Sequence, residues 1–267
     1  MKTKIFILSA ACLALSLMSS CSNDPVDDKD FATWDASVYL TNDVLYPKNA
    51  KLKRIIQSLV WERIYQYDAE GRIDKILYGK DPEYLQYDIY AYNETGLLSD
   101  ISNYYREILM TKTVFSYDDA GNIIKEDTKP GEDPEMQGNQ STFTYSYNNG
   151  KLVKSEVYFQ YLDGEINHYF IKYEYNNEGE LIREKLYVDD ENDYSTREYY
   201  YHDGLMYYSI SYYKDRVSGF GSDSRRTYDL NGNLVKQADN MPFMSSSMAP
   251  DGKQPPHIVT TEYEYYQ

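Results

Sequence analysis

The sequence contains very little cysteine, histidine and tryptophan, and it has fewer basic than acidic residues. Among 267 residues there are two cysteines, three histidines and two tryptophans. Cys12 lies in an N-terminal apolar segment, so Cys21 is the single cysteine outside it, which excludes a framework of internal disulfides. Lys and Arg total 27 against 43 Asp and Glu, and the resulting net charge of −16 disfavours nucleic acid as a partner.

The one long apolar run is at the N-terminus. Residues 1–20, MKTKIFILSAACLALSLMSS, combine a basic start with an apolar stretch and small residues before Cys21, which is the layout of a signal peptide for export. The segment Met18-Ser19-Ser20-Cys21 resembles the lipobox of bacterial lipoproteins, which implies cleavage before Cys21 and acylation of that residue. The alternative is an ordinary signal peptide followed by a chance cysteine. We therefore expect an outer-membrane lipoprotein, facing the periplasm or the cell surface, whose partner is membrane lipid.

Two further regions follow the signal peptide. Residues 21–33 are acidic and polar, and we expect them to form a flexible tether between the lipidated cysteine and the folded part. Residues 34–267 are expected to form a single domain. This domain is rich in tyrosine, with 32 in the chain. Because a tyrosine side chain can bury about 150 Å² or more, tyrosine is predicted to be its main core-forming residue.

One pattern recurs seven times: an aromatic alternating run, a turn ending in glycine, and a second alternating run. The repeated glycines, spaced 25 to 29 residues apart, are Gly71, Gly96, Gly121, Gly150, Gly179, Gly204 and Gly232. A tyrosine precedes each turn, at Tyr67, Tyr92, Tyr117, Tyr147, Tyr175, Tyr201 and Tyr228. Each unit is predicted to be a β-hairpin in which this tyrosine faces an aliphatic side chain. One step further from the turn, pairs such as Tyr65 with Lys75 are predicted.

Consecutive hairpins predict an all-β fold, an up-and-down antiparallel meander. Seven hairpins, a strand near residues 52–57 and a closing strand over residues 258–265 exceed what a flat twisted sheet accommodates. We therefore expect a curled open sheet, a half-barrel or a spiral. The stretch KLKRIIQSLVWERI, residues 51–64, could alternatively be an amphipathic helix, although its β-branched residues favour strand.

The Tyr-Asp-x-x-Gly-x-Leu/Ile pattern resembles the YD repeats of bacterial RHS-type proteins. The layout is similar to YD-repeat-containing outer-membrane lipoproteins of the Bacteroidota. The resemblance covers about residues 52–267, and it implies β-hairpins coiled into a spiralling sheet used for display or binding. It implies no known catalytic set.

Signals for catalysis or metal binding are weak, and we expect no catalytic residues, no cofactor and no metal. His168, His202 and His257 are far apart in the sequence. The acidic run at residues 189–193 could bind calcium, but it lacks the EF-hand spacing and is favoured as a solvated loop. Residues 238–257 form the one long break in the repeat. Their methionines, Met241, Met244 and Met248, are more consistent with an apolar loop than with copper ligation.

The surplus of tyrosine is the best functional indication. Clusters in residues 199–213 contain more rings than the repeat needs, so they are expected to expose some. The candidate binding residues are Tyr199, Tyr200, Tyr207, Tyr208, Tyr212 and Tyr213. We expect a binding or display module that recognises glycan or protein through these rings. The alternatives are a polysaccharide hydrolase that uses acidic residues and a structural spacer without a ligand.

Overall fold

The structure is a computed structural model, and it describes residues 40–41, 43–57, 61–80, 83–131, 140–161, 163–189, 191–214, 221–241 and 257–267. The predicted signal peptide, the lipidation residue Cys21 and the tether lie outside the described residues. So does most of the break at residues 238–257, including Met244 and Met248.

The described residues form strands joined by turns. Residues 51–64 contain strands β2 and β3, so the alternative of a helix there is wrong. The strands are β1 (Leu40–Thr41), β2 (Leu52–Gln57), β3 (Trp61–Tyr67), β4 (Ile73–Lys80), β5 (Glu83–Tyr92), β6 (Leu98–Tyr105), β7 (Ile108–Tyr117), β8 (Ile123–Pro130), β9 (Gln140–Asn148), β10 (Lys151–Gln160), β11 (Ile166–Tyr175), β12 (Leu181–Val188), β13 (Tyr194–His202), β14 (Leu205–Tyr213), β15 (Gly221–Asp229), β16 (Leu234–Met241) and β17 (His257–Tyr265). No helix in the described part of the chain is long and apolar enough to cross a membrane.

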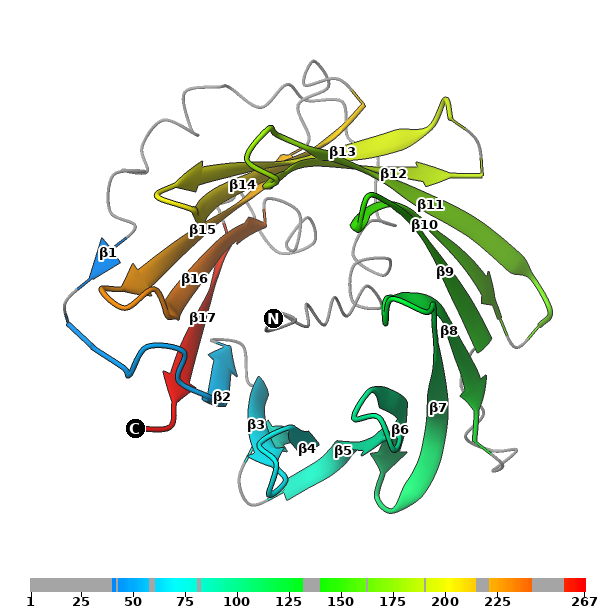
Figure 1. Cartoon of the computed structure of the whole chain (residues 1–267), viewed down its shortest axis with the longest axis horizontal. Helices are drawn as coiled ribbons and strands as arrows, with labels where there is room; N and C mark the ends of the chain where they lie inside the picture. The colour runs from blue at the N-terminus through cyan, green and yellow to red at the C-terminus, as the bar shows by residue number, and fades with distance from the viewer. Residues whose placement is uncertain are drawn as a thin grey trace, which may run out of the picture.

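Strands β2 to β17 form a closed antiparallel barrel (Figure 1). Each strand pairs with its neighbours in the chain, and the last strand, β17, pairs with β2. The prediction of an all-β antiparallel meander is confirmed, but the prediction of an open sheet, half-barrel or spiral is wrong. The short strand β1 lies outside this ring and pairs in parallel with the end of β15.

The barrel closes because the two ends of the chain together make an eighth repeat unit. Tyr265 pairs with Leu52, as Tyr67 pairs with Ile73 inside a continuous hairpin. The Tyr266 amide donates to the Lys51 carbonyl at 2.9 Å, which reproduces the first hydrogen bond of the other turns. The unit is thus a hairpin whose turn is missing, with β17 and β2 as its halves. Backbone hydrogen bonds consequently leave no open edge between the first and last strands of the ring.

The segment before β2 is held against the turn between β15 and β16. Asp229, which is fully buried, accepts a hydrogen bond from the Tyr46 amide at 2.9 Å. Asn231 Nδ2 donates to the Tyr46 carbonyl at 2.7 Å, and Asn233 Nδ2 donates to the Pro47 carbonyl at 3.1 Å. The ring of Tyr46 also contacts the ring of Tyr265, with centroids 5.1 Å apart. These contacts link the N-terminal segment to the C-terminal half of the barrel.

The turns have the predicted chemistry. Gly121 has a φ of 81°, the left-handed conformation that glycine adopts without steric cost. The Asp118 carboxylate accepts from the backbone amides of Ala120 and Asn122 at 2.9 and 2.8 Å. In the two-residue turns, Asn149 and Asp203 also have positive φ, as a type I′ turn requires.

The strand register shifts by one residue just beyond each turn. The predicted pair of Tyr67 with Ile73 is present, but Tyr65 then lies opposite Ile76 rather than Lys75. The same shift occurs in the hairpins that contain Tyr117, Tyr147 and Tyr175, so the predicted aromatic–cation pairs on one face are wrong. A β-bulge adds one residue to one strand, and because side chains alternate with period two, the basic residues move to the opposite face.

The repeat tyrosines lie on the inner face of the barrel. Both clusters of buried apolar residues, one around Ile76 and one around Phe143, belong to the same face as the repeat tyrosines. On the other face, Ile89, Val114 and Tyr158 are 39%, 47% and 46% exposed. In a closed barrel the inner side chains converge and the outer ones diverge, so the more buried face is the inner one. We call the two faces the inner wall and the outer wall.

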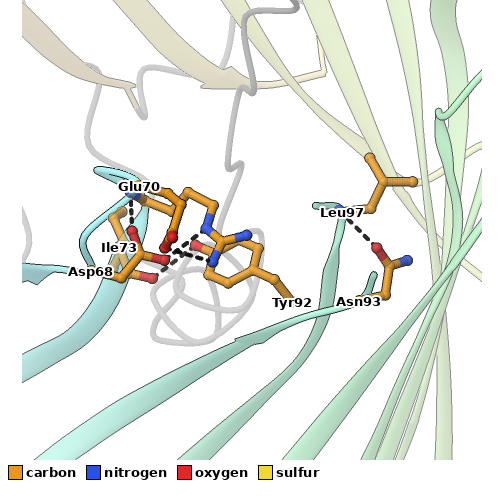
Figure 2. A network of polar contacts seen from close by, with 7 residues as sticks. Asp68, Glu70, Ile73, Tyr92, Asn93 and Leu97 are labelled. Atoms are coloured by element: carbon orange, nitrogen blue, oxygen red, sulfur yellow. Dashed lines mark hydrogen bonds and ion pairs between the residues drawn. The ribbon is translucent and has the colours of Figure 1, made fainter. Parts of the chain in front are cut away.

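A ring of tyrosine hydroxyls joins neighbouring units on the inner wall. Figure 2 shows one member, Tyr92 of β5, which points toward Ile73 of the preceding unit and donates to its carbonyl at 2.8 Å. The Arg72 guanidinium lies 4.3 Å from the centre of the same ring. Eight such bonds, 2.6 to 2.9 Å long, are donated by Tyr67, Tyr92, Tyr117, Tyr147, Tyr175, Tyr201, Tyr228 and Tyr265. Phenylalanine would fill the same space without this bond, which explains the preference for tyrosine.

Candidate binding surfaces

Two carboxyl groups on the inner wall, the half-buried Glu126 and the buried Glu184, have shifted pKa values. Glu126 accepts a hydrogen bond from the Tyr145 hydroxyl at 2.7 Å, and Glu184 interacts with the Tyr199 hydroxyl. Burial raises the pKa of both carboxyl groups, because the charged form loses its hydration, and the tyrosine hydrogen bonds only partly oppose this effect. The register shift places these residues where the alternating pattern alone would have placed Lys125 and Arg183.

The raised pKa of Glu184 makes the free energy of unfolding depend on pH. A carboxyl whose pKa is higher in the folded state stabilises the fold most below its unfolded pKa of about 4.3, and this contribution declines as the pH rises through the folded pKa. We expect Glu184→Gln, which stays neutral, to gain stability relative to the wild type between pH 4 and pH 8. Urea unfolding at both pH values measures this difference. Glu178→Gln in an exposed turn controls for the lost charge, and an equal gain there would contradict the expectation.

These two carboxyl groups do not form the pair that a glycosidase needs. Glu126 lies on β8 and Glu184 on β12, four strands apart around the wall. At about 4.8 Å per strand this is roughly 19 Å along the sheet, whereas glycosidase carboxyl pairs are about 5 to 9.5 Å apart. Each group is instead satisfied by its own tyrosine.

Ion pairs are distributed around the outer wall. Lys112 pairs with Asp100 at 3.1 Å, and Lys125 pairs with Asp127 at 2.6 Å. Other outer-wall pairs in the described part of the chain include Arg54–Glu62, Lys154–Glu156, Arg183–Glu174, Arg183–Glu198 and Arg225–Asp223. The lysine side chains at 112 and 125 are 48% and 43% exposed. The lipid-facing wall of a membrane barrel is an apolar band about 25 Å tall, and each Lys or Arg at its centre costs about 2–4 kcal/mol. Ion pairs of this kind recur around the described part of the outer wall.

An aromatic band crosses the outer wall over strands β10 to β13. Its rings contact one another in sequence, with centroids 4.6 to 5.9 Å apart, and belong to Tyr158, His168, Phe170, Tyr187 and Tyr194. Phe170 and Tyr187 stack almost parallel, at 9°, and are 7% exposed. Tyr158 at the end of the band is 46% exposed. The band thus combines a buried, stacked centre with an accessible ring at its edge.

A row of lysines lies beside the aromatic band. Lys154, Lys172 and Lys185 occupy paired positions on three consecutive strands. The Lys172 ammonium lies 5.2 Å from the Tyr187 ring, and that of Lys185 lies 5.3 Å from the Tyr194 ring, at cation–π distance. Lys172 also pairs with Glu191, which lowers the pKa of that carboxyl through the hydrogen bond and the nearby positive charge. The surface therefore offers rings, ammonium donors and carboxylate acceptors together.

The six tyrosines predicted from the sequence are divided between locations. Tyr200, Tyr208 and Tyr212 lie together on the outer wall, where Tyr200 and Tyr212 each donate to Glu198 at 3.0 Å. Tyr199 is on the inner wall beside Glu184. Tyr207 lies at the β-bulge, where the pairing register passes directly from Met206 to Tyr208. Tyr213, at the end of β14, donates to Asp193 and is 41% exposed.

The aromatic band was missed in the sequence because its residues are dispersed along the chain. Tyr158 and His168 come from consecutive strands that flank one return loop, and Tyr187 and Tyr194 flank the next. The signal in the sequence was an aromatic residue on each side of these two return loops. Strand pairing across each loop brings the two residues side by side, and together they form a row.

No group of three or more His, Cys, Asp and Glu side chains that could hold a metal ion is found in the described part of the chain. In the acidic loop considered for calcium, Glu191 pairs with Lys172 and Asp193 accepts from Tyr213.

Comparisons with known proteins identify similar folds. A porin-like protein from Bacteroides uniformis is 17% identical to this chain, with a TM-score of 0.49 over 80% of this chain and 95% of the other. Two TcdB2-TccC3 toxin structures, one of them with Cdc42, have TM-scores of 0.33. They are 16% and 17% identical over 67% of this chain and 11% of theirs. No protein-family model and no curated protein matches the sequence. The strand pairing by itself shows that the described part of the chain is a 16-stranded antiparallel β-barrel, to which these structures bear a distant similarity.

Proposed function

We propose that this protein is a lipid-anchored binding barrel of the outer membrane that stands in water and recognises a glycan through its outer wall. The observation that carries the proposal is the composition of the outer wall, where ion pairs occupy the positions that lipid would contact in a spanning barrel. Attachment is then assigned to the acyl chains on Cys21, which the lipobox-like segment predicts.

The aromatic band is the part of the outer wall best suited to a glycan. Sugars present apolar C–H faces and hydroxyl groups, so they are bound by rings flanked by charged hydrogen-bonding groups. Tyr158 offers an exposed ring at the edge of the band, and Lys154 and Glu156 lie on the same strand and the same wall. The Glu198 cluster, with Tyr200 and Tyr212, continues the wall on the next strands. These groups support a glycan bound across β10 to β14.

A glycan array probed with the full-length protein in non-ionic detergent tests this function. We expect binding to at least one polysaccharide class, and a loss of affinity of about tenfold in Tyr158→Ala, equivalent to about 1.4 kcal/mol. Tyr104→Ala is the matched control, because Tyr104 stacks on Tyr87 at 5.1 Å on the outer wall of β5 and β6, away from the band. An array without signal from folded protein, or equal losses in both variants, would contradict the proposal.

A further inference from the structure

One inner-wall position breaks the repeat. Two residues before each repeat tyrosine, the strand carries an aromatic side chain in seven units, at Tyr65, Tyr90, Phe115, Tyr145, Tyr173, Tyr199 and Tyr263. In the unit formed by β15 and β16 the same position is Arg226, which pairs with Gln237. A cation has replaced a ring at one position of an otherwise aromatic layer. The repeat itself gives no packing reason for this substitution.

Arg226 has no partner for its charge within the described residues. Its Nη1 atom is buried and makes no hydrogen bond, and no described carboxylate lies within ion-pair distance. Some other arginines of the barrel form ion pairs, such as Arg54 with Glu62 and Arg183 with Glu174, although Arg54 also has a buried Nε atom without a hydrogen-bond partner. A buried guanidinium donor without an acceptor is costly, because water is lost and not replaced. The Nη1 atom of Arg226 can thus donate a hydrogen bond to an acceptor from outside the described residues.

Neighbouring groups offer further donors. Ser224, two residues earlier on the same wall, has a buried Oγ atom that also lacks a hydrogen-bond partner. The Tyr263 hydroxyl makes no hydrogen bond to a described residue. Burial raises the pKa of Tyr263 to about 12 and the charge of Arg226 opposes this, so the two groups lie within electrostatic range. The nearby Asp239 carboxylate accepts from Gln237 Nε2 at 2.9 Å.

We propose that Arg226, with Ser224 and Tyr263, forms an oxyanion-binding site on the inner wall of the barrel. A guanidinium binds carboxylate or phosphate through two parallel N–H donors, and a hydroxyl on either side completes the acceptor's coordination. Barrels of about sixteen strands are wide enough to leave an aqueous interior, and Arg226 is only partly buried, so a small anionic solute can reach it. This site is separate from the outer-wall band.

Isothermal titration calorimetry of the full-length protein in non-ionic detergent at low ionic strength tests the site. The probes are inorganic phosphate and galacturonate. Galactose, the uncharged analogue of galacturonate, is the control. We expect one or both anions to bind and galactose not to bind. Arg226→Gln is expected to weaken anion binding at least tenfold, and Lys236→Gln, which removes one exposed charge from the outer wall of the next strand, is expected to leave it unchanged.

A second variant separates binding from folding. Arg226→Tyr restores the aromatic residue of the repeat, so it is expected to fold with unchanged circular dichroism and at least the wild-type melting temperature while losing anion binding. The proposal is overturned if the wild type binds neither anion. It is also overturned if the folded Arg226 variants bind as the wild type does, or if Lys236→Gln loses binding equally.

Discussion

Replacing Asp229 by alanine is expected to lower the free energy of unfolding by about 3 kcal/mol or more, because hydrogen bonds to a charged group contribute about 1.5–3 kcal/mol each. The buried carboxylate accepts from the amides of Tyr46, Asn231 and Asn233 and from the Asn233 side chain, at 2.9 to 3.0 Å. Without it, these donors remain in the fold with no acceptor. The N-terminal segment also loses one of its attachments to the turn between β15 and β16.

Asp118→Ala is the matched control for this prediction. Asp118 holds the same position in the turn between β7 and β8 and accepts from Ala120 and Asn122, but among the described residues its carboxylate accepts no hydrogen bond from outside this turn. We expect a clearly smaller loss of stability there, measured by urea unfolding of both variants. Equal losses would show that Asp229 acts only within its own turn.

The pH dependence of unfolding gives a second readout for Asp229. Burial acts to raise the pKa of this carboxyl, but the Asn233 side chain and the three backbone amides outweigh it, so the pKa lies below its usual value. A depressed pKa stabilises the fold above the unfolded value of about 3.9, and this contribution is lost as the pH falls through the folded pKa. The difference between wild type and Asp229→Ala should therefore shrink at acidic pH.

The hairpins were predictable from the sequence because their determinants are local. The turn residues from Asp118 to Gly121 and the pairing of Tyr117 with Ile123 depend on a few neighbouring positions that recur in each unit. Repetition made the pattern visible even though one unit alone would have been ambiguous. The strand at residues 52–57 was predicted for the same reason.

Closure of the barrel was not predictable in the same way. The eighth unit is divided between the two ends of the chain, so a search for complete repeats does not find it. Its halves are nevertheless present in the sequence, as Tyr263-Glu264-Tyr265 and Lys51-Leu52-Lys53. Pairing between them is a contact between residues more than 200 positions apart, which local patterns do not specify.

The candidate site was only partly predictable, because one residue of register decides which wall a side chain faces. The bulge beyond each turn placed Lys125 outside and Glu126 inside, the reverse of strict alternation. Tyr199 and Tyr200 are neighbours in the sequence but lie on opposite walls. The rings of residues 199–213 are therefore divided between the two walls, as their adjacency in the sequence predicts, and their role in binding stays a prediction.

Cys21→Ala is expected to release the protein completely from the membrane fraction. Two or more acyl chains anchor a protein firmly, at about 0.8 kcal/mol per buried CH₂, whereas the described outer wall carries ion pairs such as Lys112–Asp100 and Lys125–Asp127. Fractionation of cells that express the variant measures the effect. Asp43→Ala, which changes an exposed residue near the start of the described chain, is the control and should remain membrane-bound.

Detergent phase partition of the folded Cys21→Ala protein tests most directly whether the barrel stands in water. Circular dichroism and heat-dependent gel mobility first confirm that the β-barrel is intact. With ion pairs such as Lys112–Asp100 and Lys125–Asp127 on its outer wall, the unlipidated barrel should enter the aqueous phase. Recovery of the folded, unlipidated barrel in the detergent phase would show that its wall binds lipid and would contradict the proposed lipid-anchored function.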